Sequence, residues 1–243
     1  MNNKKTIVLS FFFLSMGIFS CGQKINLGQV VGTVLGGQGG GVSTNEIGAG
    51  LKEALEIGVS SSSNLASQLD GYYKNPRLKI PLPAEIQNVG NTLRKIGLGG
   101  EVDKFELALN RGAEQAAQQA KPIFIAAVKQ MTISDAISIL RGDKDAATQY
   151  LKRTTSQELF KAFSPIVQKA LTATEATKYY TSIASSYNKL PLVKPIQADL
   201  NQYATNKAMD GLFLLIADEE AKIRENPLAR TTDLLKRVFG SQK

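Results

Sequence analysis

The apolar positions of the chain are densest near its carboxyl end. Every residue from Gly211 to Ala217 is apolar or Gly, so on a helix with about 100° between residues the apolar surface runs all the way round. The run is far shorter than the ~20 residues that cross a bilayer, and the charged sequence DEEAKIRE follows it. We therefore predict that Ala208 to Pro227 contains the central helix of a helical core.

Apolar residues three and four positions apart predict helices over most of the remaining chain. Capping boxes mark several helix starts, and Gly or Pro marks several ends. Pro122 falls inside one long apolar stripe, where we expect a kink and not a break. The predicted helices run from Ser43 to about Leu69, Ala84 to Ile96, Val102 to Met131, Thr132 to Gly142 and Lys144 to Arg153, from capping boxes at Thr155 and Thr172, from after Pro195 to Asn226, and from Thr231 or Thr232 to Gly240.

The segment YYKNPRLKIPLP, residues 72–83, interrupts this helical pattern. Its three prolines forbid a continuous helix, and Leu78, Ile80 and Leu82 alternate with other residues. No other part of the chain offers a strand partner, so we interpret it as an extended connector lying over the helices. The predicted fold class is all-α, a single compact domain of eight to ten helices without internal repeats.

The first 22 residues have the order of a secretory signal. Lys4 and Lys5 precede an apolar run from Ile7 to Phe19, and the sequence Ile-Phe-Ser before Cys21 resembles a bacterial lipobox. The resemblance implies that Cys21 becomes the first residue of the mature protein and carries lipid; two or more acyl chains hold a protein stably on a membrane. The alternatives are an ordinary signal peptide or an uncleaved anchor.

A Gly-rich stretch follows the single cysteine. Six glycines lie between Gly32 and Gly41, without the preceding strand or the Lys that a phosphate-binding loop requires. This composition is typical of a flexible tether. The predicted organisation is therefore a lipoprotein signal peptide at 1–20, a lipid-anchored linker at 21–42, the helical domain at 43–240 and a tail at 241–243.

Composition restricts the function more than any motif does. The chain is 43% hydrophobic and 21% charged, as in ordinary globular proteins. Its net charge is +8, but basic and acidic residues are interspersed along the predicted helices. We therefore expect no nucleic-acid partner and at most a mild attraction to anionic surfaces. The chain has no His and one Cys, which excludes His-dependent nucleophilic catalysis, His-ligated zinc and an intramolecular disulfide. No cofactor or metal is predicted.

Asp210 is the first candidate functional residue because it directly precedes the all-round apolar run. A carboxylate there is expected to be at least half buried, and a buried carboxylate needs a partner. Lys207, one turn earlier, is the local choice, and Arg111 is the distant one. The structural interpretation is a buried ion pair that sets the helix register; the functional one is the polar floor of a ligand pocket.

A second group of charges lies at the end of the same helix. Glu220 and Arg224 are four residues apart and predict a helix-surface pair worth about 0.2–0.5 kcal/mol. Arg230 is placed to fold back on Glu219 or to bind an external anion. Paired carboxylates also perform acid–base chemistry or hold Mg²⁺ or Ca²⁺, although nothing in this spacing requires it.

Four tyrosines near the last third of the chain have two interpretations. They either rim a binding groove or bury their rings in the core with the hydroxyl in water, which is the commoner arrangement. These residues are Tyr179, Tyr180, Tyr187 and Tyr203.

Several short motifs, in a fixed order, resemble a family of exported bacterial proteins catalogued as domain of unknown function 4197. The resemblance spans about 43–240 and implies a helical domain located in the cell envelope. It supplies no activity, substrate or catalytic residue. The motifs are GLKEAL from Gly50, NPRLKIPLP from Asn75, LNRGAE from Leu109, MTISDAISILRG from Met131, AATQYLKR from Ala146, DGLF from Asp210 and IRENPLARTTDLLKRVFG from Ile223.

The leading functional hypothesis is a non-enzymatic envelope lipoprotein, facing the periplasm or the cell surface, that acts as a helical binding module. A deep apolar pocket would indicate a lipid or small-molecule ligand, and an exposed apolar patch would indicate an envelope protein as partner. The rival is a hydrolase-like enzyme whose carboxylates and arginines converge on one cleft. The third alternative is a purely structural envelope protein.

Overall fold

The computed structural model describes residues 42–95, 97, 99–173, 177, 180–181, 185, 188–189, 191, 195 and 199–240. The predicted leader with Cys21, the Gly-rich linker up to Gly41, the predicted tail at 241–243 and Glu175, the last residue of the capping box that begins at Thr172, lie outside these residues. The described part contains eight α-helices, one 3-10 turn and no strand, so the predicted all-α class is confirmed. The elements are α2 (Thr44–Ser67), α3 (Ala84–Lys95), α4 (Gly99–Ala117), α5 (Ala120–Gln130), α6 (Ile133–Arg141), α7 (Ala146–Thr172), α9 (Leu200–Glu225), η1 (Pro227–Ala229) and α10 (Asp233–Gly240).

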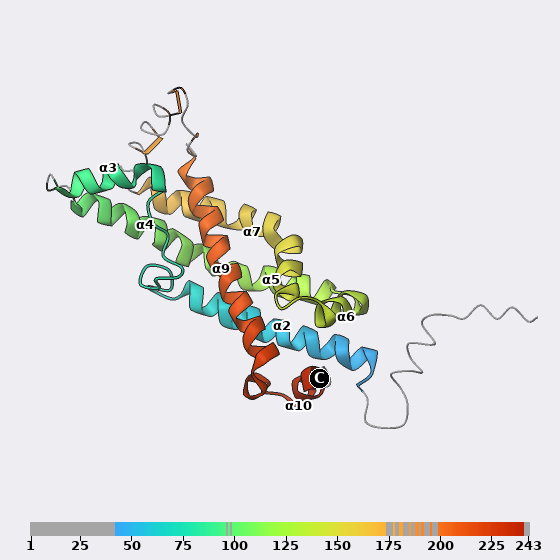
Figure 1. The fold of residues 1–243 in the computed structure, drawn as a ribbon. Helices are drawn as coiled ribbons and strands as arrows, with labels where there is room; N and C mark the ends of the chain where they lie inside the picture. The colour runs from blue at the N-terminus through green and yellow to red at the C-terminus, as the bar shows by residue number, and fades with distance from the viewer. Residues whose placement is uncertain are drawn as a thin grey trace, which may run out of the picture.

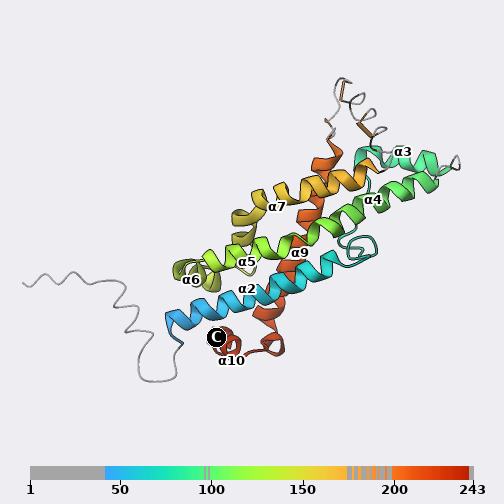
Figure 2. The ribbon, with the colours of Figure 1, turned by 180° about the vertical axis from the view of Figure 1, so that it is seen from behind.

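Helix α9 is the element that the other long helices share. Helices α2, α4 with α5, and α7 run in broadly similar directions, and α9 crosses them steeply (Figures 1 and 2). It packs against α2, α4 and α7. The predicted apolar run lies at this crossing, where Leu212, Phe213 and Ile216 are buried. Because each of the crossed helices buries part of the run, α9 is the centre of the core.

One stripe of α9 is not covered. Leu214 keeps 37% of its surface exposed although both its neighbours are buried, so the prediction of a helix enclosed on every side is wrong for this stripe. The other members of the stripe, Lys207 and Asp210, are exposed as well. The neighbouring helices therefore do not cover the apolar run where it meets this stripe.

The long apolar stripe around Pro122 forms two helices. Helix α4 ends at Ala117 and α5 starts at Ala120, so the expected kink is a break. Pro122 is the third residue of α5, where a backbone N–H has no partner within the helix and its absence is tolerated. None of the described helices is by itself long and apolar enough to span a bilayer; α5 and α6 meet that criterion only as a pair, bent by 104°.

Helix α7 is the opposite case, because it joins segments that the sequence separates. The predicted capping box at Thr155 does not form. The Thr155 hydroxyl is buried and donates a hydrogen bond to the Leu151 carbonyl at 2.6 Å, which is a bond of the helix interior. The helix also continues through Pro165. Packing of its apolar face against α4 and α9 therefore outweighs both the helix-start signal at Thr155 and the helix-breaking effect of Pro165.

The connector between α2 and α3, residues 68–83, lies over the helices without forming a strand, as predicted. Tyr72 is fully buried, and its hydroxyl donates a hydrogen bond to the Ala208 carbonyl of α9 at 2.6 Å. Burial, assisted by the negative charges of Glu114 and Asp210, raises the pKa of this hydroxyl. The hydroxyl therefore remains a donor at every physiological pH.

The ring of Tyr72 fits against α9 because residue 211 has no side chain. A Cβ added at Gly211 would lie 2.9 Å from Cε1 of Tyr72 and 3.3 Å from Cδ2 of Leu78. We expect Gly211→Ala to destabilise the fold by about 1–2 kcal/mol, since the overpacking cost exceeds the gain in helix propensity. Urea unfolding measures this change. The matched control is Gly58→Ala, whose Cβ would meet only Glu219 Cβ at an ordinary 3.5 Å, and it should be neutral or stabilising by up to about 1 kcal/mol. Equal effects of the two substitutions would contradict the close packing of Tyr72.

Candidate functional site

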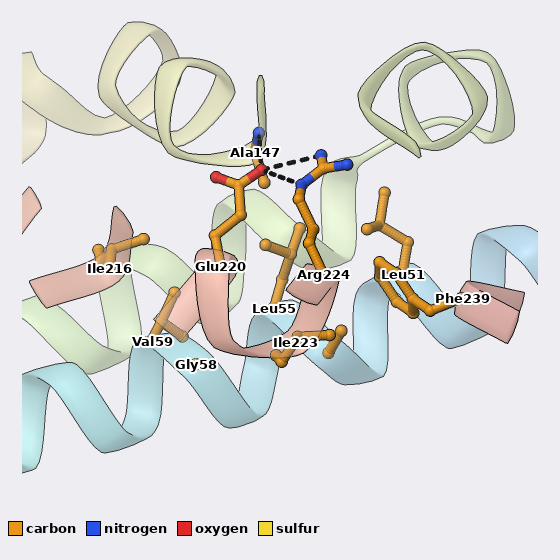
Figure 3. Close-up of a pocket in the computed structure, with 11 residues that line it drawn as sticks. Leu51, Leu55, Gly58, Val59, Ala147, Ile216, Glu220, Ile223, Arg224 and Phe239 are labelled. Carbon is orange, nitrogen blue, oxygen red and sulfur yellow. Dashed lines mark hydrogen bonds and ion pairs between the residues drawn. The ribbon is translucent and has the colours of Figure 1, made fainter. Parts of the chain in front are cut away.

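Glu220 lies on α9 beside the first turn of α7 and is only 8% exposed. Its carboxylate lies beside Ala147 (Figure 3) and accepts a hydrogen bond from the Ala147 amide at 3.0 Å. It also accepts hydrogen bonds from the Thr148 amide and the Thr148 hydroxyl, both at 2.8 Å. Asp145, the residue in the N-cap position of α7, makes no side-chain capping bond. Glu220 thus caps α7 from another helix, where its charge also favours the positive end of the helix dipole.

Arg224 links Glu220 to the carboxyl end of a third helix, α6. Its guanidinium pairs with Glu220 at 2.9 Å and donates hydrogen bonds to the carbonyls of Ile139, at 2.8 Å, and Leu140, at 3.4 Å, in the last turn of α6. Arg230 donates to the carbonyls of Ile223 and Arg224 at 3.0 and 2.9 Å, at the end of α9. The group that was predicted as a helix-surface pair is a largely buried connection between the ends of α6, α7 and α9.

The cavity beside this pair is too small for a ligand. Its lining is mostly apolar and comes from α2, α7, α9 and α10, and it includes Glu220 and Arg224 (Figure 3). Its volume is about 20 Å³, which suits a single water molecule. A deep apolar pocket, which would indicate a lipid or small-molecule ligand, is therefore not formed at this position.

Arg111 belongs to a different cluster, between α4 and the connector. It pairs with Glu114 on its own helix and with Asp70 at 2.7 Å, and Lys74 reaches Asp70 at 2.9 Å. The hydrogen bonds from Lys74 and then Arg111 hold the pKa of Asp70 below its usual range. Asp70 itself adopts φ of 68°, a left-handed conformation that Asp tolerates better than most residues.

Glu114 is a site residue that sequence reasoning missed. It is 4% exposed, and one carboxylate oxygen accepts hydrogen bonds from the amides of Tyr72 and Tyr73, both at 3.1 Å. Its only signal in the sequence is the spacing of three from Arg111, which permits a pair on a helix. That spacing does not reveal the two amides, since they come from a segment about forty residues away.

The structure places Asp210 and Glu219 apart from both clusters. Asp210 is exposed, so it is not the buried, paired acid that the structural interpretation requires. The buried position next to it is Gly211, and a turn of about 100° along the helix points Asp210 outward. Among the residues that the structure describes, it forms no ion pair with Lys207 or Arg111. Glu219 is only partly exposed and pairs with Lys222 on its own helix at 2.6 Å, and not with Arg230.

The six charged candidates therefore occupy separate places. Glu220, Arg224 and Arg230 join helix ends, and Arg111 holds the connector. Asp210 is exposed, and Glu219 is partly buried and pairs with Lys222 on α9. The single cleft that a carboxylate–arginine enzyme requires is not formed by these residues. Within the described ranges, no group of three or more Cys, Asp or Glu side chains is arranged to hold a metal ion.

An open groove runs between the connector and the uncovered stripe of α9. We call it the connector groove; its volume is about 580 Å³. The hydroxyl of Tyr203 donates a hydrogen bond to the Pro81 carbonyl at 3.1 Å across it, and Leu214 is exposed in it. Of the four tyrosines, Tyr180 is buried in the core, and Tyr179 and Tyr187 lie outside the described residues. The lining consists of residues 77–82, Ala84 and Gln87 on one side and Tyr203, Lys207, Asp210, Gly211 and Leu214 on the other.

The fold and these contacts define an all-helical domain in which buried charges join helix ends and connectors. A family model described as "Protein of unknown function (DUF4197)" matches residues 41–240. The chain belongs to this family, as the resemblance of its motifs implied. No curated protein matches the chain, and no solved structure matches it.

Two acids on α9, Glu220 and Asp210, should differ sharply in their effect on stability. We expect Glu220→Ala to lower the free energy of unfolding by about 3–5 kcal/mol, because it leaves Arg224 and the α7 amides without a partner. Asp210→Ala should change it by less than about 0.5 kcal/mol, since the side chain is exposed. Urea unfolding of both variants decides this. A loss of several kcal/mol in Asp210→Ala would contradict its exposed position.

Proposed function

We propose that this protein is a non-enzymatic, membrane-anchored protein of the cell envelope, and that it binds a segment of a partner protein in the connector groove. The observation that carries the proposal is Leu214. It is a large apolar side chain in an otherwise buried run, yet 37% of it faces an open groove of about 580 Å³. Exposed apolar surface with a polar rim is the usual composition of a protein interface.

The shape of the groove favours a polypeptide over a small ligand. Small-molecule sites enclose most of the ligand surface, whereas this groove is an open trough, bordered by the connector and the start of α3 on one side and by α9 on the other. The cavity near Glu220 has room for about one water molecule. Both charged clusters support a binding role over catalysis, because Glu114 and Glu220 already accept hydrogen bonds from main-chain amides.

The anchoring part of the proposal rests on the sequence around Cys21. We expect Cys21→Ala to move the protein from the membrane fraction to the soluble fraction, because the lipid-bearing side chain is removed. Ser20→Ala is the matched control, since it keeps a small residue before the cysteine, and this variant should stay with membranes. Fractionation followed by immunoblotting provides the measurement. Membrane association of Cys21→Ala equal to that of the unaltered chain would contradict a lipid anchor.

The groove is tested by a photo-crosslinking amino acid placed at Leu214 in living cells. We expect a discrete adduct with one protein, mapped by mass spectrometry to one segment of that partner. The same label at Leu69, which is 76% exposed and does not line the groove, should give no such adduct.

The mapped segment must then bind on its own. As a synthetic peptide it should bind the purified full chain, and Leu214→Glu should weaken binding at least tenfold, or about 1.4 kcal/mol. Identical adducts from labels at Leu214 and Leu69 would contradict binding in this groove. So would a peptide that binds the Leu214→Glu variant as tightly as the unaltered chain.

A further inference from the structure

We infer that the segment bound in the connector groove carries an acidic, a basic and a large apolar side chain, in that order along α9 and at alternate positions of an extended chain. This inference rests on the proposed function and adds the chemistry of the partner. It follows from two observations on the groove: some of its charged side chains already form ion pairs, and the others, which form none among the described residues, have a fixed spacing along α9.

Two of the cations that line the groove are already neutralised. Arg77 makes a bidentate pair with Asp218, at 2.6 and 3.0 Å, and Lys79 pairs with Glu106 at 3.3 Å. The groove therefore does not present a uniformly basic surface, and a strongly acidic ligand has no special advantage there.

Lys207 and Asp210 are the two groove charges that remain available. Both are exposed, and neither forms a hydrogen bond or an ion pair among the described residues, although they are only one turn apart. A partner side chain of opposite sign is thus able to pair with each of them without first breaking an existing contact. The complementary segment carries an acid opposite Lys207 and a base opposite Asp210.

The spacing on α9 sets the spacing in the partner. With a rise of 1.5 Å per residue, Asp210 lies about 4.5 Å and Leu214 about 10 Å beyond Lys207 along the helix axis. In an extended chain, side chains on one face recur about every 6.6 Å. Three alternate residues therefore span about 13 Å, which is about 3 Å more than the distance from Lys207 to Leu214 along α9. Different tilts of the Lys207 and Asp210 side chains compensate for this excess. The apolar side chain of the segment then lies over Leu214.

The main chain of the connector does not offer a strand edge to this segment. The N–H and C=O of Ile80 both bond to the side chain of Asn110, at 2.8 and 2.9 Å, on the α4 side. Facing the groove, Pro81 has no N–H and its carbonyl accepts from Tyr203, while the Lys79 amide donates to Asn75. Strand addition needs a row of open groups. Recognition therefore falls to the side chains of α9.

The test begins with a random twelve-residue peptide library displayed on phage and selected on the full chain in detergent. Peptides whose binding is lost in Leu214→Glu should be enriched in the order acid, any residue, base, any residue, large apolar residue, or in its reverse. A synthetic copy of the best peptide should bind about three- to tenfold more tightly at low salt than the same peptide with its acid and base exchanged, as two exposed ion pairs allow.

Exchanging the charges on the protein should exchange this preference. The double variant Lys207→Asp with Asp210→Lys should prefer the peptide whose acid and base are exchanged. The matched control is Glu219→Lys with Lys222→Glu, which inverts a pair outside the groove on the same helix and should leave the preference unchanged. Thermal unfolding confirms that each double variant is folded.

The outcomes separate the two proposals. Peptides that depend on Leu214 but tolerate exchange of their acid and base would overturn this inference and leave the proposed function standing. A selection in which no recovered peptide depends on Leu214 would overturn both.

Discussion

The structure depends most on the carboxylate of Glu220 at the beginning of α7. Burying a charge costs several kcal/mol unless its hydrogen bonds are replaced, and here two amides, one hydroxyl and the Arg224 guanidinium replace them. The Arg224 guanidinium also donates hydrogen bonds to two carbonyls in the last turn of α6. One ion pair therefore satisfies the open backbone groups of two helices and fixes both of them on α9.

Glu114 of α4 repeats this arrangement at the connector. Its carboxylate accepts hydrogen bonds from the amides of Tyr72 and Tyr73 and pairs with Arg111, so side chains of α4 hold in place a connector that has no regular secondary structure. Asn110 adds two bonds to Ile80, one turn before Glu114 on α4. Because the connector is held on the α4 side, it stands beside the open stripe of α9 without covering it, and the connector groove results.

This use of charged side chains supports the proposed binding role over catalysis. The buried carboxylates of Glu114 and Glu220 already accept hydrogen bonds from backbone donors, so neither is a free base. Lys207 and Asp210, which have no side-chain partner among the residues that the structure describes, are exposed beside an apolar residue. Such an arrangement suits the proposed recognition of another chain by complementarity of charge and shape.

The sequence alone determined the local features of this protein, because they depend on neighbours within one or two helical turns. Ser43 and Thr132 cap their helices as the sequence indicates, Asn226 and Pro227 end α9, and the apolar period predicts an all-α core. Tertiary packing decided whether a local signal is used: Thr155 is overridden within α7, and Pro122 opens a helix. It also decided the partners of Glu220 and Glu114, which lie about seventy and forty residues away, and the exposure of Asp210. A carboxylate's environment is set by which helices cross above it, and neither periodicity nor spacing along one chain contains that information.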